Sequence, residues 1–293
     1  MKRNILARRA ASATLAACMM FTLSAPALAA STDALLQQST AAKSAVSVLD
    51  EENGTEVETE YQMNLKYGSI TVYIGADDKQ YVQQGNNEAQ QRGNLSITTD
   101  GGRTTNTLTI EGGTTAAKVT LHNVNIDASG AAVSVSGDVE LIISGTNTLQ
   151  SGWGHAGVEK ADDNGTLTIS GSGTLNAYGG ESGAGIGSGS QKGCSNIEIE
   201  SGIINAHGGQ WGAGIGSGNV GNRPGVLGGS YITINGGDVT AYGGSEAAGI
   251  GGGFQGDGKN ITIEGGTVYA ESGGGNGPVA AIGGGREIGR AHV

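Results

Sequence analysis

The sequence is poor in proline, aromatic residues and cysteine. Of its 293 residues, 3 are Pro, 2 are Phe, 2 are Trp, 8 are Tyr and 2 are Cys. With so few prolines and no Gly-X-Y period, the chain is not a collagen-like triple helix, although 56 residues are Gly. The low aromatic content also disfavours a β-propeller, whose blades are longer and usually richer in aromatic side chains.

The N-terminus has the features of a secretory signal peptide spanning residues 1–30. Basic residues come first, an apolar stretch follows, and Ala27-Leu28-Ala29 forms a cleavage site. Ser, Thr and Pro interrupt the apolar stretch, which disfavours a permanent membrane span. Leu15-Ala16-Ala17-Cys18 resembles a lipoprotein signal, but an apolar run continues after Cys18. We therefore expect a secreted protein, with a lipid anchor at Cys18 as the alternative.

The expected mature chain is acidic and has a single thiol. Removal of residues 1–30 would leave 12 Lys and Arg against 27 Asp and Glu, a formal charge of −15. Such a surface repels polyanions, so nucleic acid is not an expected partner. Cys194 alone cannot form an internal disulfide. Stability must therefore come from packing or from bound metal.

Short alternating segments follow a polar leader. Residues 31–60 are small, polar and acidic, which is typical of a disordered linker. Beyond them, segments such as Ser69–Ile74 and Thr107–Ile110 alternate apolar and polar residues, which predicts β-strands. No window after the signal peptide has a helical period.

The second half of the chain is a repeat. Its first strand recurs at Ile169, Ile199, Ile234 and Ile263, at steps of 30, 35 and 29 residues. Each unit adds a second strand, such as Leu175–Tyr178, and a third of the type Ala-Gly-Ile-Gly. Coils of about 30 residues with three short strands predict an all-β parallel β-helix over residues 61–286, with roughly eight coils. The inward positions would be Leu167/Ile169, Ile197/Ile199, Ile232/Ile234, Ile261/Ile263 and Leu175/Ala177 with its equivalents.

The last seven residues break this pattern. Reverse translation of residues 287–293 gives a stretch that resembles a sequencing-library adapter read in frame. We therefore expect this tail to be non-native, and we expect the natural protein to continue beyond Arg286.

A catalytic role is not expected. Polysaccharide lyases need a basic residue beside calcium-binding carboxylates, and Arg92, Arg103, Arg223 and Arg286 are scattered in loops or near the ends. Asp162-Asp163 resembles a glycosidase carboxylate pair, but it precedes an Asn-Gly turn, where Asp serves local hydrogen bonds. His122, His155 and His207, the histidines before residue 287, show no metal-binding spacing.

A binding role rests on the register of the repeats. Tyr178, His207, Tyr242 and Glu271 occupy one outward position in four successive coils, about 4.8 Å apart per coil. A second column beside them contains Asn176, Asn205, Thr240 and Tyr269. Aromatic rings can stack on sugar rings while amides and hydroxyls bind sugar hydroxyls. The alternative is that the columns only stack on themselves and stabilise the solenoid.

Calcium is a further possibility that the carboxylates leave open. Glu198, Glu200 and Glu264 project from first strands, and Asp127, Asp162, Asp163, Asp238 and Asp257 occupy turns. Oxygen ligands of this kind suit Ca²⁺, although no individual ligand can be assigned.

The repeat GAGIGSG…NIEIESGIINAHGGQWGAGIGSG…YITINGGDVTAYGG and the segment 119–152 resemble a known family. They are similar to glycine-rich secreted carbohydrate-binding domain proteins of Firmicutes, over about residues 65–285. The resemblance implies a right-handed parallel β-helix related to pectate lyases, non-catalytic glycan binding and calcium sites. The chain departs from that family at an insertion over residues 219–224 and at Glu271, where a planar ring would be expected.

We therefore expect a non-catalytic, polysaccharide-binding β-helix at the cell surface or in the extracellular matrix. The glycan would be neutral, or acidic if Ca²⁺ bridges it to the protein. A structural stalk or adhesin segment is the alternative, and a polysaccharide lyase is the third possibility.

Overall fold

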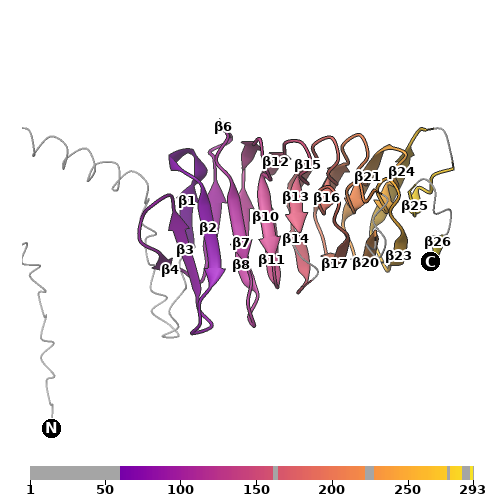
Figure 1. Cartoon of the computed structure of the whole chain (residues 1–293). Helices are drawn as coiled ribbons and strands as arrows, with labels where there is room; N and C mark the ends of the chain where they lie inside the picture. Colours follow the sequence, from indigo (N-terminus) through magenta and orange to yellow (C-terminus); the bar gives the residue numbers. More distant parts are fainter. Residues whose placement is uncertain (1–59, 161–163, 222–227, 276–277, 286–290, 293) are drawn as a thin grey trace, which may run out of the picture. The chain divides into compact units, whose positions relative to one another are not determined.

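The structure is a computed structural model that describes residues 60–160, 164–221, 228–275, 278–285 and 291–292 (Figure 1). The expected signal peptide, the lipoprotein-like segment and most of the leader lie outside these residues. Strands of three sheets follow one another along the chain in a repeating order, so that each coil adds one strand to each sheet. This is the predicted parallel β-helix.

Sheet A is formed by the first strand of each coil. Its strands, in spatial order, are β1 (Tyr61–Asn64), β5 (Leu95–Thr98), β8 (Ala117–His122), β11 (Val139–Ser144), β14 (Leu167–Gly171), β17 (Cys194–Ile199), β20 (Gly229–Ile234), β23 (Gly258–Ile263) and β26 (Ala291–His292).

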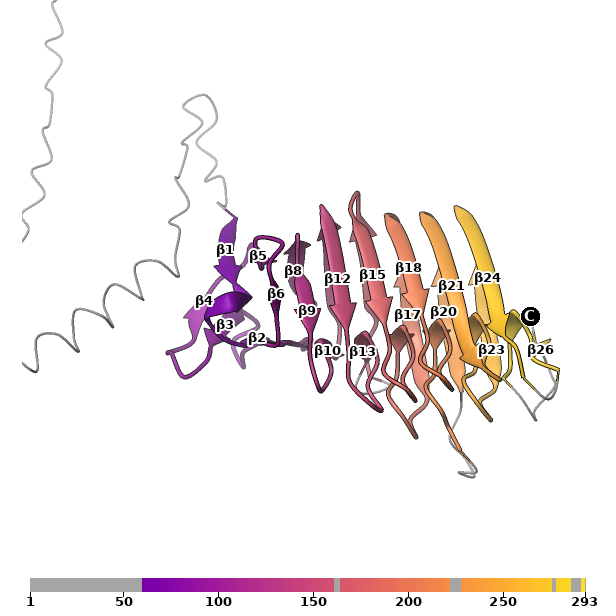
Figure 2. The same ribbon diagram turned by 90° about the horizontal axis from the view of Figure 1, so that it is seen from above.

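Sheet C is formed by the second strand of each coil and lies as a row of parallel arrows in Figure 2. Its strands are β6 (Arg103–Thr104), β9 (Asn125–Asp127), β12 (Thr146–Gln150), β15 (Thr174–Tyr178), β18 (Ile203–His207), β21 (Asp238–Ser245) and β24 (Thr267–Gly273).

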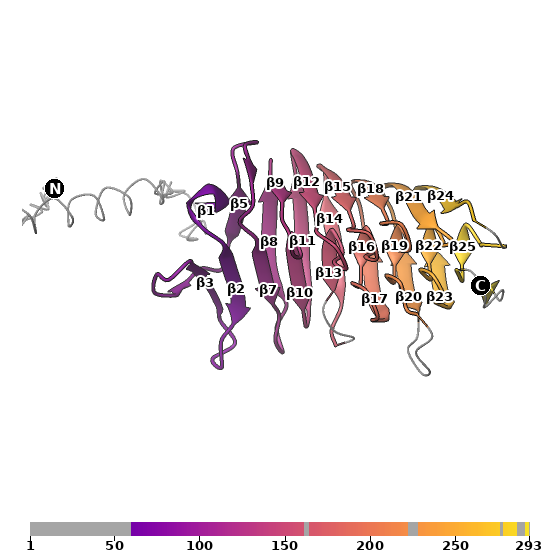
Figure 3. The ribbon, with the colours of Figure 1, turned by 45° about the horizontal axis from the view of Figure 1, so that its top comes forward.

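Sheet B is formed by the third strand of each coil, and its short strands form the row from β16 to β25 in Figure 3. It contains β4 (Gln90–Gln91), β3 (Gln80–Gln84), β2 (Ile70–Ile74), β7 (Leu108–Glu111), β10 (Val133–Ser136), β13 (Val158–Lys160), β16 (Ile186–Gly187), β19 (Ile215–Gly216), β22 (Ile250–Gly251) and β25 (Ile282–Gly283).

The predicted register is confirmed by the strand pairing. Ile169 pairs with Ile199, Ile199 with Ile234 and Ile234 with Ile263, all in parallel. Seven successive coils run from β5 to β25, and a first coil precedes them. That first coil departs from the expected pattern, because a 3₁₀ turn, η1 (Leu65–Tyr67), follows β1, and β3 and β4 pair antiparallel beside β2.

Inward side chains of the three sheets form one continuous core. The predicted inward residues of the repeats, such as Leu167, Ile199 and Ala177, are fully buried. The exceptions are Val268 and Ala270, which are partly buried, and Ile263, whose side chain is 44% exposed. Ile263 belongs to the last complete coil, where β26 pairs only with the start of β23, at Gly258 and Lys259. Ile263 pairs in register with the buried Ile234, so its predicted inward position is confirmed, but little of the next coil covers it in the part that the structure describes.

The glycines of sheet B lie at close contacts between successive coils. Gly216 has φ +134°, and a Cβ on it would lie 2.0 Å from the carbonyl oxygen of Gly251 in the next coil. Gly187 and Gly251 have the same relation to the coils that follow them. Because side chains other than hydrogen do not fit there, the Ile-Gly strands let successive coils approach closely.

One inward position of sheet C holds a polar residue. Asn147 is fully buried and occupies the register position at which the next coil has Leu175. Its Oδ1 accepts a hydrogen bond from the Val124 N–H at 3.0 Å, and its Nδ2 donates to the Ser144 and Thr174 carbonyls at 3.1 and 3.3 Å. The buried amide therefore satisfies backbone groups at the corner between sheets A and C.

A left-handed backbone position recurs in sheet A. Asn196, Tyr231 and Asn260 have φ values of 59°, 51° and 52°, and each lies between paired residues of its strand. Asn tolerates this conformation well, whereas Tyr does not. Because Tyr231 is 57% exposed, packing of its side chain offsets little of the backbone strain at this position.

Candidate functional site

The outward face of sheet C contains both predicted columns, and we call this face the platform. Alternation along each strand directs Ala177 and its equivalents into the core and leaves the neighbouring side chains outside. The register pairs Tyr178 with His207, His207 with Tyr242 and Tyr242 with Glu271. We call this line of residues the ring column. The prediction that these four residues share one position is confirmed.

Glycines directly before the strands of sheet B help to position the ring column. A Cβ on Gly185 would lie 2.6 Å from the backbone nitrogen of His207, and one on Gly214 would lie 2.8 Å from that of Tyr242. The first glycine of each Gly-Ile-Gly segment thus lets the next coil approach at the strand end that carries the ring.

Three rings of the ring column form a continuous stack. The ring centroids of Tyr178 and His207 are 4.8 Å apart, and those of His207 and Tyr242 are 4.9 Å apart, with interplanar angles of 13° and 19°. Both faces of the His207 ring are therefore covered by tyrosine. Tyr269 of the neighbouring column meets Tyr242 edge-on, with centroids 5.9 Å apart and an angle of 61°.

Exposure rises toward the C-terminal end of this stack. Tyr178 and His207 are half-buried, whereas Tyr242 is 36% and Tyr269 is 52% exposed. Burial lowers the pKa of His207 below its ordinary value, because it disfavours the charged imidazolium. The Tyr269 hydroxyl donates a hydrogen bond of 2.7 Å to Glu271, which raises the pKa of Tyr269. Glu271, the departure from the aromatic pattern, thus orients a neighbouring ring.

The second line of outward residues is uncharged, and we call it the amide column. It contains Asn176, Asn205, Thr240 and Tyr269 in register, as predicted. The Asn205 Nδ2 donates to the Asn176 Oδ1 at 2.9 Å, and the Asn176 Nδ2 donates to the Asn147 carbonyl at 3.3 Å.

Both columns continue upstream beyond the residues that the sequence singled out. Gln150 and Asp127 extend the ring column, and Thr148 and Asn125 extend the amide column. The alternation of polar and apolar residues in Thr146–Gln150 could have indicated these outward positions. These coils lack the glycine motif by which the later coils can be aligned in the sequence.

Arg103 stands at the upstream end of the platform. It lies in β6, where it pairs in register with Asn125, and its guanidinium forms an ion pair with Asp127. Arg103 therefore lies near an end, as expected, although in the edge strand of sheet C and not in a loop. The guanidinium of Arg92, the other described arginine, lies 4.3 Å from the centroid of the Tyr61 ring. Arg223 and Arg286 lie outside the described residues.

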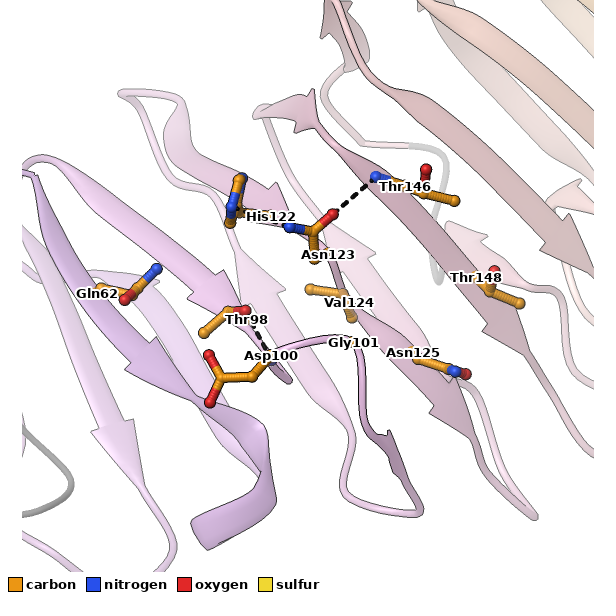
Figure 4. A pocket seen from close by; sticks show the side chains of 10 residues that line it. All are labelled: Gln62, Thr98, Asp100, Gly101, His122, Asn123, Val124, Asn125, Thr146 and Thr148. Carbon is orange, nitrogen blue, oxygen red and sulfur yellow. Dashed lines mark hydrogen bonds between the residues drawn. The ribbon is translucent and has the colours of Figure 1, made fainter.

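A polar pocket adjoins the upstream end of the amide column. Its volume is about 450 Å³, and Figure 4 shows the ten residues that line it, at the corner between sheets A and C. Thr98 and His122 come from sheet A, and Asn125, Thr146 and Thr148 come from sheet C. No pattern in the sequence indicated this pocket. We call it the corner pocket.

The carboxylates proposed for calcium do not gather in the described part of the chain. No group of three or more His, Cys, Asp or Glu side chains there could hold a metal ion. The Asn235 Nδ2 donates to Glu200 at 2.6 Å, and Asp257 forms an ion pair with Lys259 at 2.6 Å. Asp162 and Asp163 lie outside the described residues. Calcium binding stays a prediction.

Comparison with known families supports the fold. The family model of the beta helix repeat matches four segments, residues 167–190, 197–219, 232–254 and 261–286. These segments are the four glycine-rich coils. The chain folds as a parallel β-helix, and these four coils match the beta helix repeat. No curated protein and no solved structure gave a significant match. Among the described residues, no helix is both long and apolar enough to span a membrane.

Proposed function

We propose that this β-helix protein is secreted, non-catalytic and binds polysaccharide along the platform. The observation that carries this proposal is the placement of two columns side by side on one sheet, one aromatic and one of neutral hydrogen-bonding side chains. A sugar residue has apolar C–H surfaces and a rim of hydroxyls, so both kinds of side chain are needed to bind it. Parallel coils repeat the pair of columns, which suits a linear polymer.

The stacked rings define how a glycan would contact them. Because the inner faces of Tyr178, His207 and Tyr242 cover one another, these residues offer ring edges and polar atoms to a ligand. The exposed ring of Tyr269 offers apolar surface at the downstream end. A glycan would therefore rest on the edges of the stack, with its hydroxyls toward Asn176, Asn205 and Thr240.

The charge of the platform favours neutral glycans. Between Asp127 and Glu271 the ring column carries no carboxylate, lysine or arginine, and neither does the amide column from Asn125 to Tyr269. The acidic remainder of the chain would repel uronates unless Ca²⁺ bridged them. We accordingly propose neutral polysaccharide as the principal ligand, with acidic polysaccharide bound only in the presence of Ca²⁺.

The non-catalytic part of the proposal is supported by the described arginines. A lyase needs a free strong base beside the uronate, and Arg92 and Arg103 are engaged with Tyr61 and Asp127. Incubation with polygalacturonate and Ca²⁺ should therefore release no unsaturated uronate, measured by ultraviolet absorbance. Sustained release would contradict this part.

Binding can be tested by titration calorimetry with soluble xylan, glucomannan and polygalacturonate, the last with Ca²⁺ or chelator. We expect affinity for a neutral polymer to fall about tenfold in Tyr242→Ala, which corresponds to about 1.4 kcal/mol. Tyr231→Ala is the matched control, because Tyr231 is 57% exposed but lies in β20 of sheet A and not on the platform. Equal affinities of the two variants would refute the platform as the binding surface.

A structural stalk is the second candidate, and the stack itself favours it. The rings of Tyr178, His207 and Tyr242 stack on one another. Asn205 donates a hydrogen bond to Asn176, so both columns stabilise the solenoid without any ligand. A stalk would bind none of the three polymers, and Tyr242→Ala would then lower only the stability.

A further inference from the structure

The corner pocket exists because neighbouring turns between sheets A and C differ in length. The turn after β5 has four residues, 99–102, whereas two residues follow β8 and one follows β11. The longer turn forms a lip beside the shorter ones. Hydrogen bonds hold this lip, since the Asp100 N–H donates to Thr98 Oγ1 at 2.9 Å and the Gly101 N–H donates to the Asn123 carbonyl at 3.0 Å.

One wall of the pocket is fixed by side-chain hydrogen bonds. The Thr146 N–H donates to Asn123 Oδ1 at 3.0 Å, a contact drawn in Figure 4. The Asn123 Nδ2 lies 3.0 Å from His122 Nε2, and the His122 Nδ1 lies 3.2 Å from Ser144 Oγ. A wall held in this way needs little further ordering when a ligand binds.

Other lining groups have hydrogen-bonding capacity left for a ligand. The side chains of Gln62, Asn125, Thr146 and Thr148 make no hydrogen bond with any described residue. The Asp100 carboxylate accepts one from Asn64 at 2.6 Å and forms an ion pair with Lys66 at 3.7 Å, but its side chain is 64% exposed and its oxygens can accept further hydrogen bonds. Amides, hydroxyls and one carboxylate together match the hydroxyl groups of a sugar. No lysine or arginine lines the pocket to neutralise an anionic ligand.

The pocket also lies where the amide column ends. Asn125 and Thr148 belong to both, and the next register position beyond Asn125 is Arg103, paired with Asp127. A glycan that follows the amide column upstream would therefore meet the exposed Arg103 side chain and the lip.

We propose that the corner pocket binds the terminal sugar residue of a neutral linear glycan whose following residues lie along the amide column. This inference rests on the proposed function and adds that the protein recognises chain ends. A volume of about 450 Å³ is within the range of about 300–1,000 Å³ for small-molecule sites.

The test uses the full mature chain, xylohexaose, mannohexaose and cellohexaose, and soluble xylan and glucomannan in size-fractionated form. By titration calorimetry, we expect one protein bound per glycan chain at every chain length. Thr148→Val and Asn125→Ala should each weaken hexasaccharide binding about two- to tenfold, because each removes a hydrogen bond worth about 0.5–1.5 kcal/mol. The matched control is Thr168→Val, an outward threonine of sheet A. Thermal unfolding should show all three variants folded.

The outcomes separate the two proposals. Stoichiometry that rises with polymer length, together with wild-type affinity in Thr148→Val, would overturn chain-end recognition. If Tyr242→Ala still weakened binding in that case, the platform proposal would survive. Absence of binding of every probe to the wild-type protein would overturn both.

Discussion

The substitution Gly216→Ala tests the close packing of the coils most directly, because it adds one methyl group at a contact between backbones. This residue lies in β19, between Gly187 and Gly251 of the adjacent coils. Alanine there would place Cβ 2.0 Å from the Gly251 carbonyl oxygen, at a φ of +134°. The backbone of one coil would have to move, because both groups in contact are main chain.

The size of the effect follows from two contributions. A non-glycine residue in this region of φ costs about 1–3 kcal/mol. Relief of the overlap moves the Gly251 oxygen away from Ser217, whose N–H donates to it at 3.0 Å. Loss of that buried bond adds about 1–3 kcal/mol. We therefore expect Gly216→Ala to lower the free energy of unfolding by about 4 kcal/mol.

The matched control is Gly130→Ala. A Cβ on Gly130 would meet no atom within 4 Å, and its φ does not lie in the left-handed region. We expect a change within about 0.5 kcal/mol or a slight stabilisation. Urea unfolding followed by far-ultraviolet circular dichroism measures both variants. If Gly216→Ala proved as stable as Gly130→Ala, the close approach of coils at sheet B would be refuted.

Three further predictions address other positions. Asn147→Leu should destabilise by about 1–3 kcal/mol in urea unfolding despite its gain in apolar surface, because the corner backbone groups lose their partner; wild-type stability would contradict that role. Tyr231→Asn should stabilise by about 1 kcal/mol by relieving left-handed strain, whereas the control Tyr231→Ala should not. Burial lowers the pKa of His207 from its ordinary value of 6.5, so the unfolded chain binds more protons than the folded chain as the pH falls below that value. The melting temperature of the wild-type protein should therefore fall as the pH drops through 6.5, and it should fall less in His207→Phe. Equal pH profiles of the two proteins would exclude the effect.

The sequence was sufficient to predict the repeat region but not the corner pocket. Alternation and the Ile-Gly motif fixed the register from Ile169 to Ile263, because a slip of one residue would expose the core. They also placed Tyr178, His207 and Tyr242 in one column. The ring orientations depend on side-chain torsions, which periodicity does not determine. The pocket depends on turn lengths in coils without the glycine motif, so no repeated residue type marked it.

The glycines of sheet B and the rings of sheet C are connected through the spacing of the coils. Close approach of backbones at Gly187, Gly216 and Gly251 requires glycine in each coil, and the same coils carry the rings with centroids 4.8 and 4.9 Å apart. Those distances equal the strand spacing of a parallel sheet, about 4.8 Å, so the rings stack without bending the strands. A side chain that forced the coils apart at sheet B would also separate the rings. Gly216→Ala should therefore weaken glycan binding as well as stability, whereas Tyr242→Ala should act on binding more than on the fold. Because the glycines set the spacing and the outward residues supply the contacts, the two kinds of variant can be told apart by measuring both properties.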